Sequence, residues 1–197
     1  APVSLVTPGT RAPEAPEAPQ APGLITIDDF MKIQLKVAKV TVNMGVGEGG
    51  ERLAKAEALL QQLTGQKPIK NLAKSPNPSF GVRKGTPIAC KVTLRKTKAE
   101  EFLKKAFEAI ERKVQPTSFD GEGNVSFGIK EHIDIPGVRY DPAVGIFGMD
   151  GCLTLERPGY RIKRRRLQSK KIPRSHRVAK EEAIEFIKGT YQVNQEE

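Results

Sequence analysis

The residues of this sequence whose spacing could support chemistry include a glycine-rich run. Gly45-Val46-Gly47-Glu48-Gly49-Gly50 fits the pattern G-x-G-x-x-G, between an alternating apolar segment and a helical one. In a dinucleotide site, such glycines let a pyrophosphate approach a helix N-terminus. The residue about twenty positions on is Lys70, where an acidic residue would be expected to hold the ribose. A dinucleotide-binding enzyme using Gly45–Gly50 is therefore the alternative function, and a flexible strand-to-helix turn is the simpler interpretation.

A second candidate is the pair His132 and Asp134, which would lie on the same side of an extended segment. A carboxylate in that position could orient an imidazole for general-base catalysis. No Ser or Cys nucleophile can be paired with it from the sequence, so a structural histidine is favoured. The two cysteines, Cys90 and Cys152, are too far apart to indicate a zinc site or a disulfide scaffold. We therefore expect no catalytic residue, no metal and no cofactor.

The distribution of charge is the stronger signal. The 197 residues carry a formal net charge of +10. From Arg157 to Lys180 there are eleven basic residues and no acidic ones, and from Lys67 to Lys98 there are nine basic residues and no acidic ones. The rest of the chain is net acidic, whereas a surface shaped only for solubility would intersperse the two signs. Two such windows predict contact with a polyanion. No apolar run reaches the ~20 residues that span a bilayer, and no signal peptide is recognised, so we expect no membrane partner and a reduced compartment.

Hydrophobic periodicity predicts the elements that position these windows. Period-two alternation predicts strands at residues 37–44, 88–95, 124–130 and 148–156, with a weaker one at 67–74. Helical spacing predicts helices at 28–36, 52–64, 99–113 and 179–188, with Gly65 and Gly189 ending the second and the last. Residues 75–87 are rich in Pro and Gly and are predicted to form a long exposed loop. Residues 1–23 are predicted to be a Pro/Ala-rich tail.

These elements predict an α+β fold, with an antiparallel sheet, helices packed on one face and an open polar face that binds RNA. We expect three parts: the tail at 1–23, an α+β RNA-binding domain at 24–156, and a basic segment with a C-terminal helix at 157–197. The polar face of the two clearest strands should carry three cations and no carboxylate, which suits phosphate and ribose oxygens. Its members are Lys39, Thr41, Asn43, Lys91, Thr93 and Arg95.

Several stretches together carry a resemblance to a known family. They include Val40-Thr41-Val42-Asn43-Met44-Gly45, Phe80-Gly81-Val82-Arg83-Lys84-Gly85, Gly128-Ile129-Lys130-Glu131-His132-Ile133-Asp134-Ile135-Pro136-Gly137 and Leu155-Glu156-Arg157-Pro158-Gly159-Tyr160. In this order, over roughly residues 37–190, the chain resembles the large-subunit ribosomal protein "L five" family, which binds 5S rRNA, in its archaeal and eukaryotic branch.

The resemblance implies a structural constituent of the cytoplasmic ribosome, without catalysis. It implies binding to 5S rRNA and 23S rRNA in the central protuberance, and a loop near P-site tRNA. Further implied partners are a small-subunit head protein at an intersubunit bridge and the neighbouring 5S-associated ribosomal proteins. A different possibility is a general nucleic-acid chaperone that acts through Arg157–Lys180 alone.

The residues assigned to these contacts fall into three sets. Matching positions of the family add Gln66 to the polar face, and the predicted 5S rRNA-binding residues are Lys39, Thr41, Asn43, Gln66, Lys91, Thr93 and Arg95. The predicted tRNA-facing loop residues are Lys74, Ser75, Asn77, Arg83 and Lys84. The predicted rRNA-binding residues of the basic segment are Arg161, Lys163, Arg164, Arg165, Arg166, Lys170 and Lys171.

Overall fold

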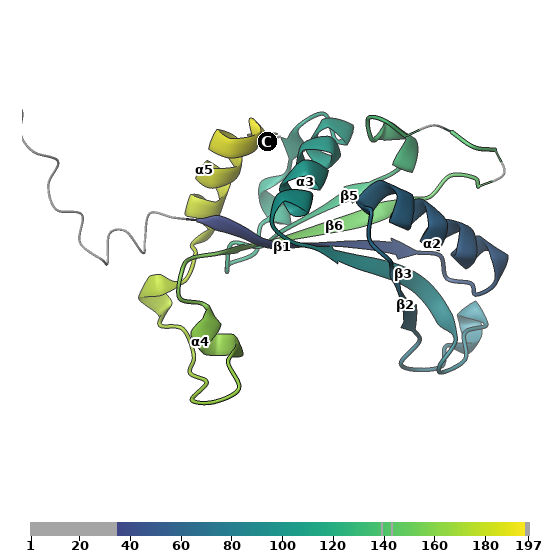
Figure 1. The fold of residues 1–197 in the computed structure, drawn as a ribbon, viewed down its shortest axis with the longest axis horizontal. Coiled ribbons are helices and arrows are strands. Elements are labelled where there is room, and N and C mark those ends of the chain that lie inside the picture. The colour runs from purple at the N-terminus through teal and green to yellow at the C-terminus, as the bar shows by residue number, and fades with distance from the viewer. Residues whose placement is uncertain (1–34, 139, 143, 196–197) are drawn as a thin grey trace, which may run out of the picture.

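The fold is built around one five-stranded antiparallel sheet that carries helices on one side (Figure 1). A computed structural model describes residues 35–138, 140–142 and 144–195. The strands lie in the order β2-β3-β1-β6-β5, and every neighbouring pair is antiparallel. Their bounds are β1 Lys36–Gly45, β2 Ile69–Leu72, β3 Pro87–Leu94, β5 Val125–Ile129 and β6 Met149–Glu156. The short strands β4 (Lys113–Val114) and β7 (Asn194–Gln195) form a separate parallel pair.

The helices that cover the sheet are α2 (Glu51–Thr64), α3 (Thr97–Ala109) and α5 (Lys180–Tyr191). A short helix, α4 (Arg161–Arg164), lies on the opposite side of the sheet (Figure 1). Single 3₁₀ turns complete the fold. They are η1 Pro78–Phe80, η2 Pro116–Ser118, η3 His132–Asp134 and η4 Arg174–His176. The predicted α+β class with an antiparallel sheet is confirmed.

The alternation of side chains along each strand produces the core. In β1, Val40, Val42 and Met44 are fully buried, whereas the residues between them are only half-buried. The same two-residue period holds in β5 and β6, because successive side chains of a strand point to opposite faces. The apolar face of the sheet packs against the helices. Phe107 of α3 joins them, with its ring centroid 5.3 Å from Phe127 on β5 and 5.2 Å from Tyr191 on α5.

The last helix runs further than the sequence predicts. Gly189 does not end α5, which continues to Tyr191 and stops at Gln192, where the backbone becomes left-handed with φ of 53°. Tyr191 is buried against Phe107, and this burial raises its pKa to about 12. The apolar contact of the final turn therefore outweighs the weak helix propensity of one glycine.

Two other predicted helices also differ from the structure. The helix predicted for 99–113 ends at Ala109, because Glu111 and Arg112 adopt left-handed φ values of 54° and 58° and Lys113 pairs with Asn194 in the β4–β7 ladder. Of the helix predicted for 28–36, residues 28–34 lie outside the described residues, and Lys36 already belongs to β1.

The stretch predicted as an exposed loop at 75–87 is a bonded hairpin. Ala73 donates its N–H to Thr86 O at 2.9 Å, and Asn77 and Val82 exchange backbone hydrogen bonds of 2.8 and 3.0 Å. A left-handed Gly81, with φ of 65°, turns the chain at the end of η1. The backbone of this segment is therefore fixed as an extension of β2 and β3, although most of its side chains are exposed.

Candidate nucleic-acid interface

Polar side chains form rows across the sheet, on the face away from the core. Strand register places Thr93, Thr41, Cys152 and Ser126 side by side across β3, β1, β6 and β5. Directly paired residues of antiparallel strands share a face. All four side chains are short and end in a hydroxyl or a thiol, and Thr93, Cys152 and Ser126 are exposed. A backbone or a sugar edge can therefore approach this row closely. We call this face, with the rows on either side, the polar sheet face.

Charged and amide side chains flank the central row. On one side lie Lys91, Asn43 and Asp150, in register across β3, β1 and β6. As expected, β1 and β3 contribute no carboxylate to this face, but β6 lies beside β1 and adds Asp150, which is exposed, so the expectation is wrong for the face as a whole. The Asn43 side-chain oxygen accepts a hydrogen bond from Asn71 Nδ2 at 3.4 Å, which leaves the Asn43 amide group to donate outward.

The opposite flank contains Lys39 and, directly after β3, Arg95. Lys39 pairs with Thr154 on β6. Arg95 is exposed and donates from Nη1 to the Ala38 carbonyl at 3.5 Å, beside an irregularity in the β1–β6 register between Val37 and Lys39. Of the predicted 5S rRNA-binding residues, the register thus brings together six, and only Gln66 lies apart. Gln66 is half-buried in the connection between α2 and β2, outside the paired strands.

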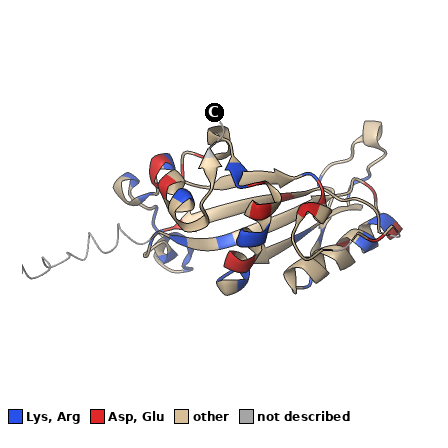
Figure 2. Ribbon diagram, turned by 90° about the horizontal axis from the view of Figure 1, so that it is seen from above, with Lys and Arg blue, Asp and Glu red and all other residues tan. Residues whose placement is uncertain are grey.

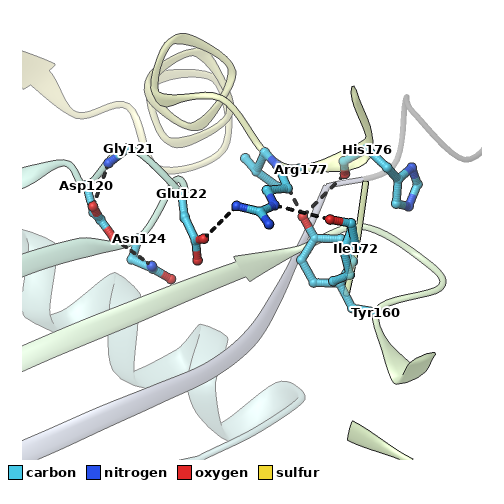
Figure 3. A network of polar contacts seen from close by, with 9 residues as sticks. Asp120, Gly121, Glu122, Asn124, Tyr160, Ile172, His176 and Arg177 are labelled. Carbon is cyan, nitrogen blue, oxygen red and sulfur yellow. Dashed lines mark hydrogen bonds and ion pairs between the residues drawn. The ribbon is translucent and has the colours of Figure 1, made fainter. Parts of the chain in front are cut away.

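The C-terminal basic segment, residues 157–179, is fixed to the folded core rather than extended from it. Tyr160 is its main anchor, because its hydroxyl donates to His176 O at 3.3 Å and accepts from the Val178 N–H at 3.1 Å (Figure 3). Burial raises the pKa of Tyr160. Two apolar residues of the segment itself, Ile172 and Val178, are buried.

Ion pairs tie the same segment to its surroundings. Arg177 reaches Glu122, in the loop before β5, at 3.2 Å, and its Nε donates to Ile172 O at 3.3 Å (Figure 3). Arg164 pairs with Glu156 at the end of β6 at 2.6 Å. Arg157 is buried and pairs with Glu182 in the first turn of α5, while its Nε has no hydrogen-bond partner among the described residues.

A groove of about 690 Å³ separates the basic segment from the end of the polar sheet face. Cys152 and Thr154 line it from the sheet, together with Lys39. Lys163, Arg164, Lys171 and Arg177 line it from the basic segment. The structure therefore brings predicted rRNA-binding residues next to the polar sheet face, although they are more than a hundred residues away from β1 in sequence. The remaining predicted cations, Arg161, Arg165, Arg166 and Lys170, are exposed on the same segment.

The helices, in contrast, show mixed charges. Figure 2, a view from above, shows both basic (blue) and acidic (red) residues on them. Helices α2 and α3 each carry equal numbers of basic and acidic residues, and α5 carries one more acidic residue than basic. The basic excess of the described chain therefore lies away from the helical layer.

The predicted tRNA-facing residues lie on the hairpin between β2 and β3. Lys74, Ser75 and Asn77 lie on one arm and Arg83 and Lys84 on the other, and all five are exposed. Sequence reasoning overlooked the residue at its tip. Phe80 is 78% exposed, and it borders a groove that also includes part of the Gly45–Gly50 run. A lone aromatic between Pro and Gly could have drawn attention to it, because an apolar residue in a turn has no strand or helix to pack it.

The other sequence candidates for chemistry have structural roles. His132 is buried, and its Nδ1 accepts the Phe147 N–H at 3.3 Å. Cys90 is fully buried in the core, and this burial raises the pKa of its thiol. The strand before the glycine run, β1, is antiparallel to both of its neighbours, whereas a dinucleotide site of this type needs a parallel βαβ unit.

Among the described residues, no three His, Cys, Asp or Glu side chains gather where they could hold a metal ion. In the same part of the chain, no helix is long and apolar enough to cross a bilayer.

Comparison with known proteins gives consistent matches. Residues 32–83 match the family described as "Ribosomal protein L5", and residues 87–186 match the "ribosomal L5P family C-terminus". "Large ribosomal subunit protein uL5" of Methanosphaera stadtmanae is 54% identical over 80% of this chain and 94% of its own. The protein of that name from Sulfurisphaera tokodaii is 57% identical over 85% of this chain and 94% of its own. The one from Methanobrevibacter smithii is 50% identical over 82% and 95%.

Proposed function

The chain belongs to the ribosomal protein L5 family, and we propose that it binds 5S rRNA in the large ribosomal subunit through the polar sheet face. Members of this family are structural constituents of the large subunit, a component of the cytoplasmic ribosome, and are not enzymes. The dinucleotide-binding alternative at Gly45–Gly50 is therefore set aside, in agreement with the antiparallel setting of β1.

The observation that carries the proposal is the row Thr93, Thr41, Cys152 and Ser126, between flanks that hold the cations Lys39, Lys91 and Arg95. Short hydroxyl groups pair with ribose and phosphate oxygens, and flanking cations neutralise phosphates. A-form RNA exposes 2′-hydroxyls and phosphates across a wide, shallow groove. The side chains of the central row are short enough to lie against such a surface without steric conflict.

The other partners are assigned to other parts of the chain. We assign 23S rRNA to the basic segment, from Arg161 to Lys171, because three of its cations, Lys163, Arg164 and Lys171, line the groove beside the polar sheet face. We assign P-site tRNA to the hairpin residues Lys74, Ser75, Asn77, Arg83 and Lys84. Contacts with a small-subunit head protein and with neighbouring 5S-associated proteins belong to the same proposal, as expected for this family in the central protuberance.

The test of the 5S assignment is the double variant Asn43→Ala with Arg95→Ala, titrated with 5S rRNA. Each lost polar contact should cost about 1 kcal/mol, so affinity should fall at least roughly tenfold. The matched control is Gln62→Ala with Lys105→Ala, which also removes one amide and one cation, but from exposed positions on the helical side. Equal affinities for the two double variants would refute the assignment.

The hairpin assignment has a separate test. Arg83→Ala with Lys84→Ala should leave affinity for 5S rRNA unchanged, because the hairpin tip lies beyond the rows of the polar sheet face. In reconstituted subunits the same variant should change the chemical footprint on P-site tRNA. An unchanged tRNA footprint would exclude these two cations from tRNA contact.

A further inference from the structure

An aromatic ring is presented to solvent at the tip of the β2–β3 hairpin by a backbone that is held in place. Phe80 ends η1, and its N–H donates to Asn77 O at 3.3 Å. The Ser79 hydroxyl donates to the Asn77 side-chain oxygen at 2.6 Å, and the Asn77–Val82 bonds close the turn below it. The ring is 78% exposed, and because the backbone of the turn is already fixed, binding at the ring orders no further backbone.

The ring borders an open groove of about 440 Å³ between the hairpin and the glycine run. Val46 and Gly47 line it, and both donate their N–H groups to Ile88 O, at 3.1 and 2.9 Å. Gly47 has φ of 80°, and no atom lies within 4 Å of where its Cβ would be. Ala73, Val82 and Ile88 also line the groove, so much of its lining is apolar.

Polar groups at the edge of the groove are not used by the fold. Lys74, Ser75 and Glu48 line it, and none of the three makes a side-chain hydrogen bond or ion pair with another described residue. They offer a cation, a hydroxyl and a carboxylate to a ligand that has an apolar face and polar edges. Small-ligand sites typically combine a mainly apolar lining with a few polar groups of this kind.

The charge around the groove favours a nucleic acid over a protein segment. The window from Lys67 to Lys98, which contains the hairpin, has nine basic residues and no acidic ones. Arg83 and Lys84 follow the tip and are exposed. Every nucleobase has a π-face that stacks on an aromatic ring, and its phosphate needs a cation nearby.

We propose that this groove binds one unstacked nucleobase of a folded RNA, with the base stacked on Phe80 and its phosphate close to Lys74. The inference rests on the proposed RNA-binding function and adds a base-binding site to it. The base can belong to a tRNA or to a ribosomal RNA, and the chemistry of the site is the same for both.

The 197-residue sequence has no Trp, so Phe80→Trp introduces a single tryptophan reporter at the site. This variant is titrated with deacylated tRNA in one experiment and with 5S rRNA in a second. The RNA that supplies the base should quench the tryptophan fluorescence. The matched control is Leu72→Trp, at a position on the same hairpin that is 59% exposed but does not line the groove. Its fluorescence should change little, and a fully paired RNA duplex should quench neither variant.

The RNA affinity of other Phe80 variants is an independent test of the base-binding site. Phe80→Leu keeps an apolar side chain but removes the π-face, and should weaken binding of the quenching RNA roughly tenfold. Phe80→Tyr should restore it. The side chain is mostly exposed, so these variants should unfold at the temperature of the parent chain.

The outcomes separate this inference from the proposed function. If Phe80→Trp binds 5S rRNA with the parent affinity but neither RNA quenches it, the base-binding site is refuted and the polar sheet face still stands. Equal quenching by the fully paired duplex, or equal affinity of Phe80→Leu and the parent, also refutes the site. If the hairpin instead binds a protein, neither RNA will quench the fluorescence of Phe80→Trp, whereas large-subunit proteins will quench it, and the base-binding site is refuted. If the parent chain binds no 5S rRNA, the proposed function itself fails.

Discussion

Single residues decide how closely the two faces of the sheet can be approached. On the core face, Gly151 of β6 pairs with Phe127 of β5, and a Cβ at Gly151 would come within 2.5 Å of the Phe127 ring. On the opposite face, Gly128 pairs with Asp150, and a Cβ there would meet only Asp150 Oδ1, at 3.8 Å. Of these two glycines on neighbouring strands, only Gly151 therefore has a steric reason to lack a side chain.

This difference predicts unequal effects of the same substitution. Gly151→Ala should destabilise the fold by about 1–3 kcal/mol, because the Phe127 ring must move within a packed core. Gly128→Ala is the control and should change the free energy of unfolding by less than about 0.5 kcal/mol. Urea denaturation of both variants measures the effect. A Gly151→Ala variant as stable as Gly128→Ala would show that the ring has room to relocate.

The surroundings of Asp150 and Phe80 could not be predicted from the sequence. The alternation of residues 148–156 places Asp150 on the non-core face of its strand, but only the strand order puts that strand beside Asn43. Phe80 has no periodic partner, so its exposure becomes evident only from the backbone bonds that shape the hairpin. In both cases the missing information is tertiary, because it concerns which segments become neighbours.

At the scale of elements, the sequence pattern correctly predicted those strands and helix ends that depend on local interactions. The strand at 37–44 was recognisable from Val40, Val42 and Met44, because one buried face imposes a two-residue period. The end of α2 was recognisable from Gly65, which adopts the left-handed conformation with φ of 60°. The end of α5 was predicted wrongly at Gly189, because the packing of Tyr191 on α3 extends that helix.

The position of Gly189 inside α5 leads to a prediction for this element. Gly189→Ala should stabilise the protein by about 0.5–1 kcal/mol, since no atom lies within 4 Å of the added Cβ and Ala is the better helix former. Gly65→Ala should instead destabilise it, because φ of 60° is unfavourable for a side chain. Thermal denaturation should show shifts of opposite sign, and a destabilised Gly189→Ala would mean that α5 depends on the flexibility of that residue.

For the whole molecule, the separation of charge predicts how RNA binding responds to salt. If the polar sheet face and the basic segment neutralise about six phosphates, log affinity should fall against log salt with a slope of about −4 to −5. Titrations of 5S rRNA between about 50 and 200 mM salt measure this slope. A nearly flat response would contradict phosphate contact.

A single substitution on the basic segment tests the number of phosphate contacts. Arg166 is exposed and makes no side-chain hydrogen bond or ion pair with another described residue. If it contacts a phosphate, Arg166→Ala should reduce the magnitude of the slope by about 1. Removal of Lys105 on the helical side should leave the slope unchanged, and an equal change in both variants would indicate a general effect of net charge.

The attachment of residues 157–179 at both ends has a thermodynamic consequence. The segment leaves β6 directly and enters α5, whose residues Ala183 and Ile187 are buried in the core, and Tyr160 and Arg177 fasten it in between. The basic segment has therefore lost most of its conformational freedom during folding. Binding a polyanion then costs the segment little further conformational entropy. Cleavage of the backbone between Lys171 and Arg177 would remove no basic side chain. It would, however, leave part of the basic segment attached at one end only, and that part would have to be ordered each time a polyanion binds.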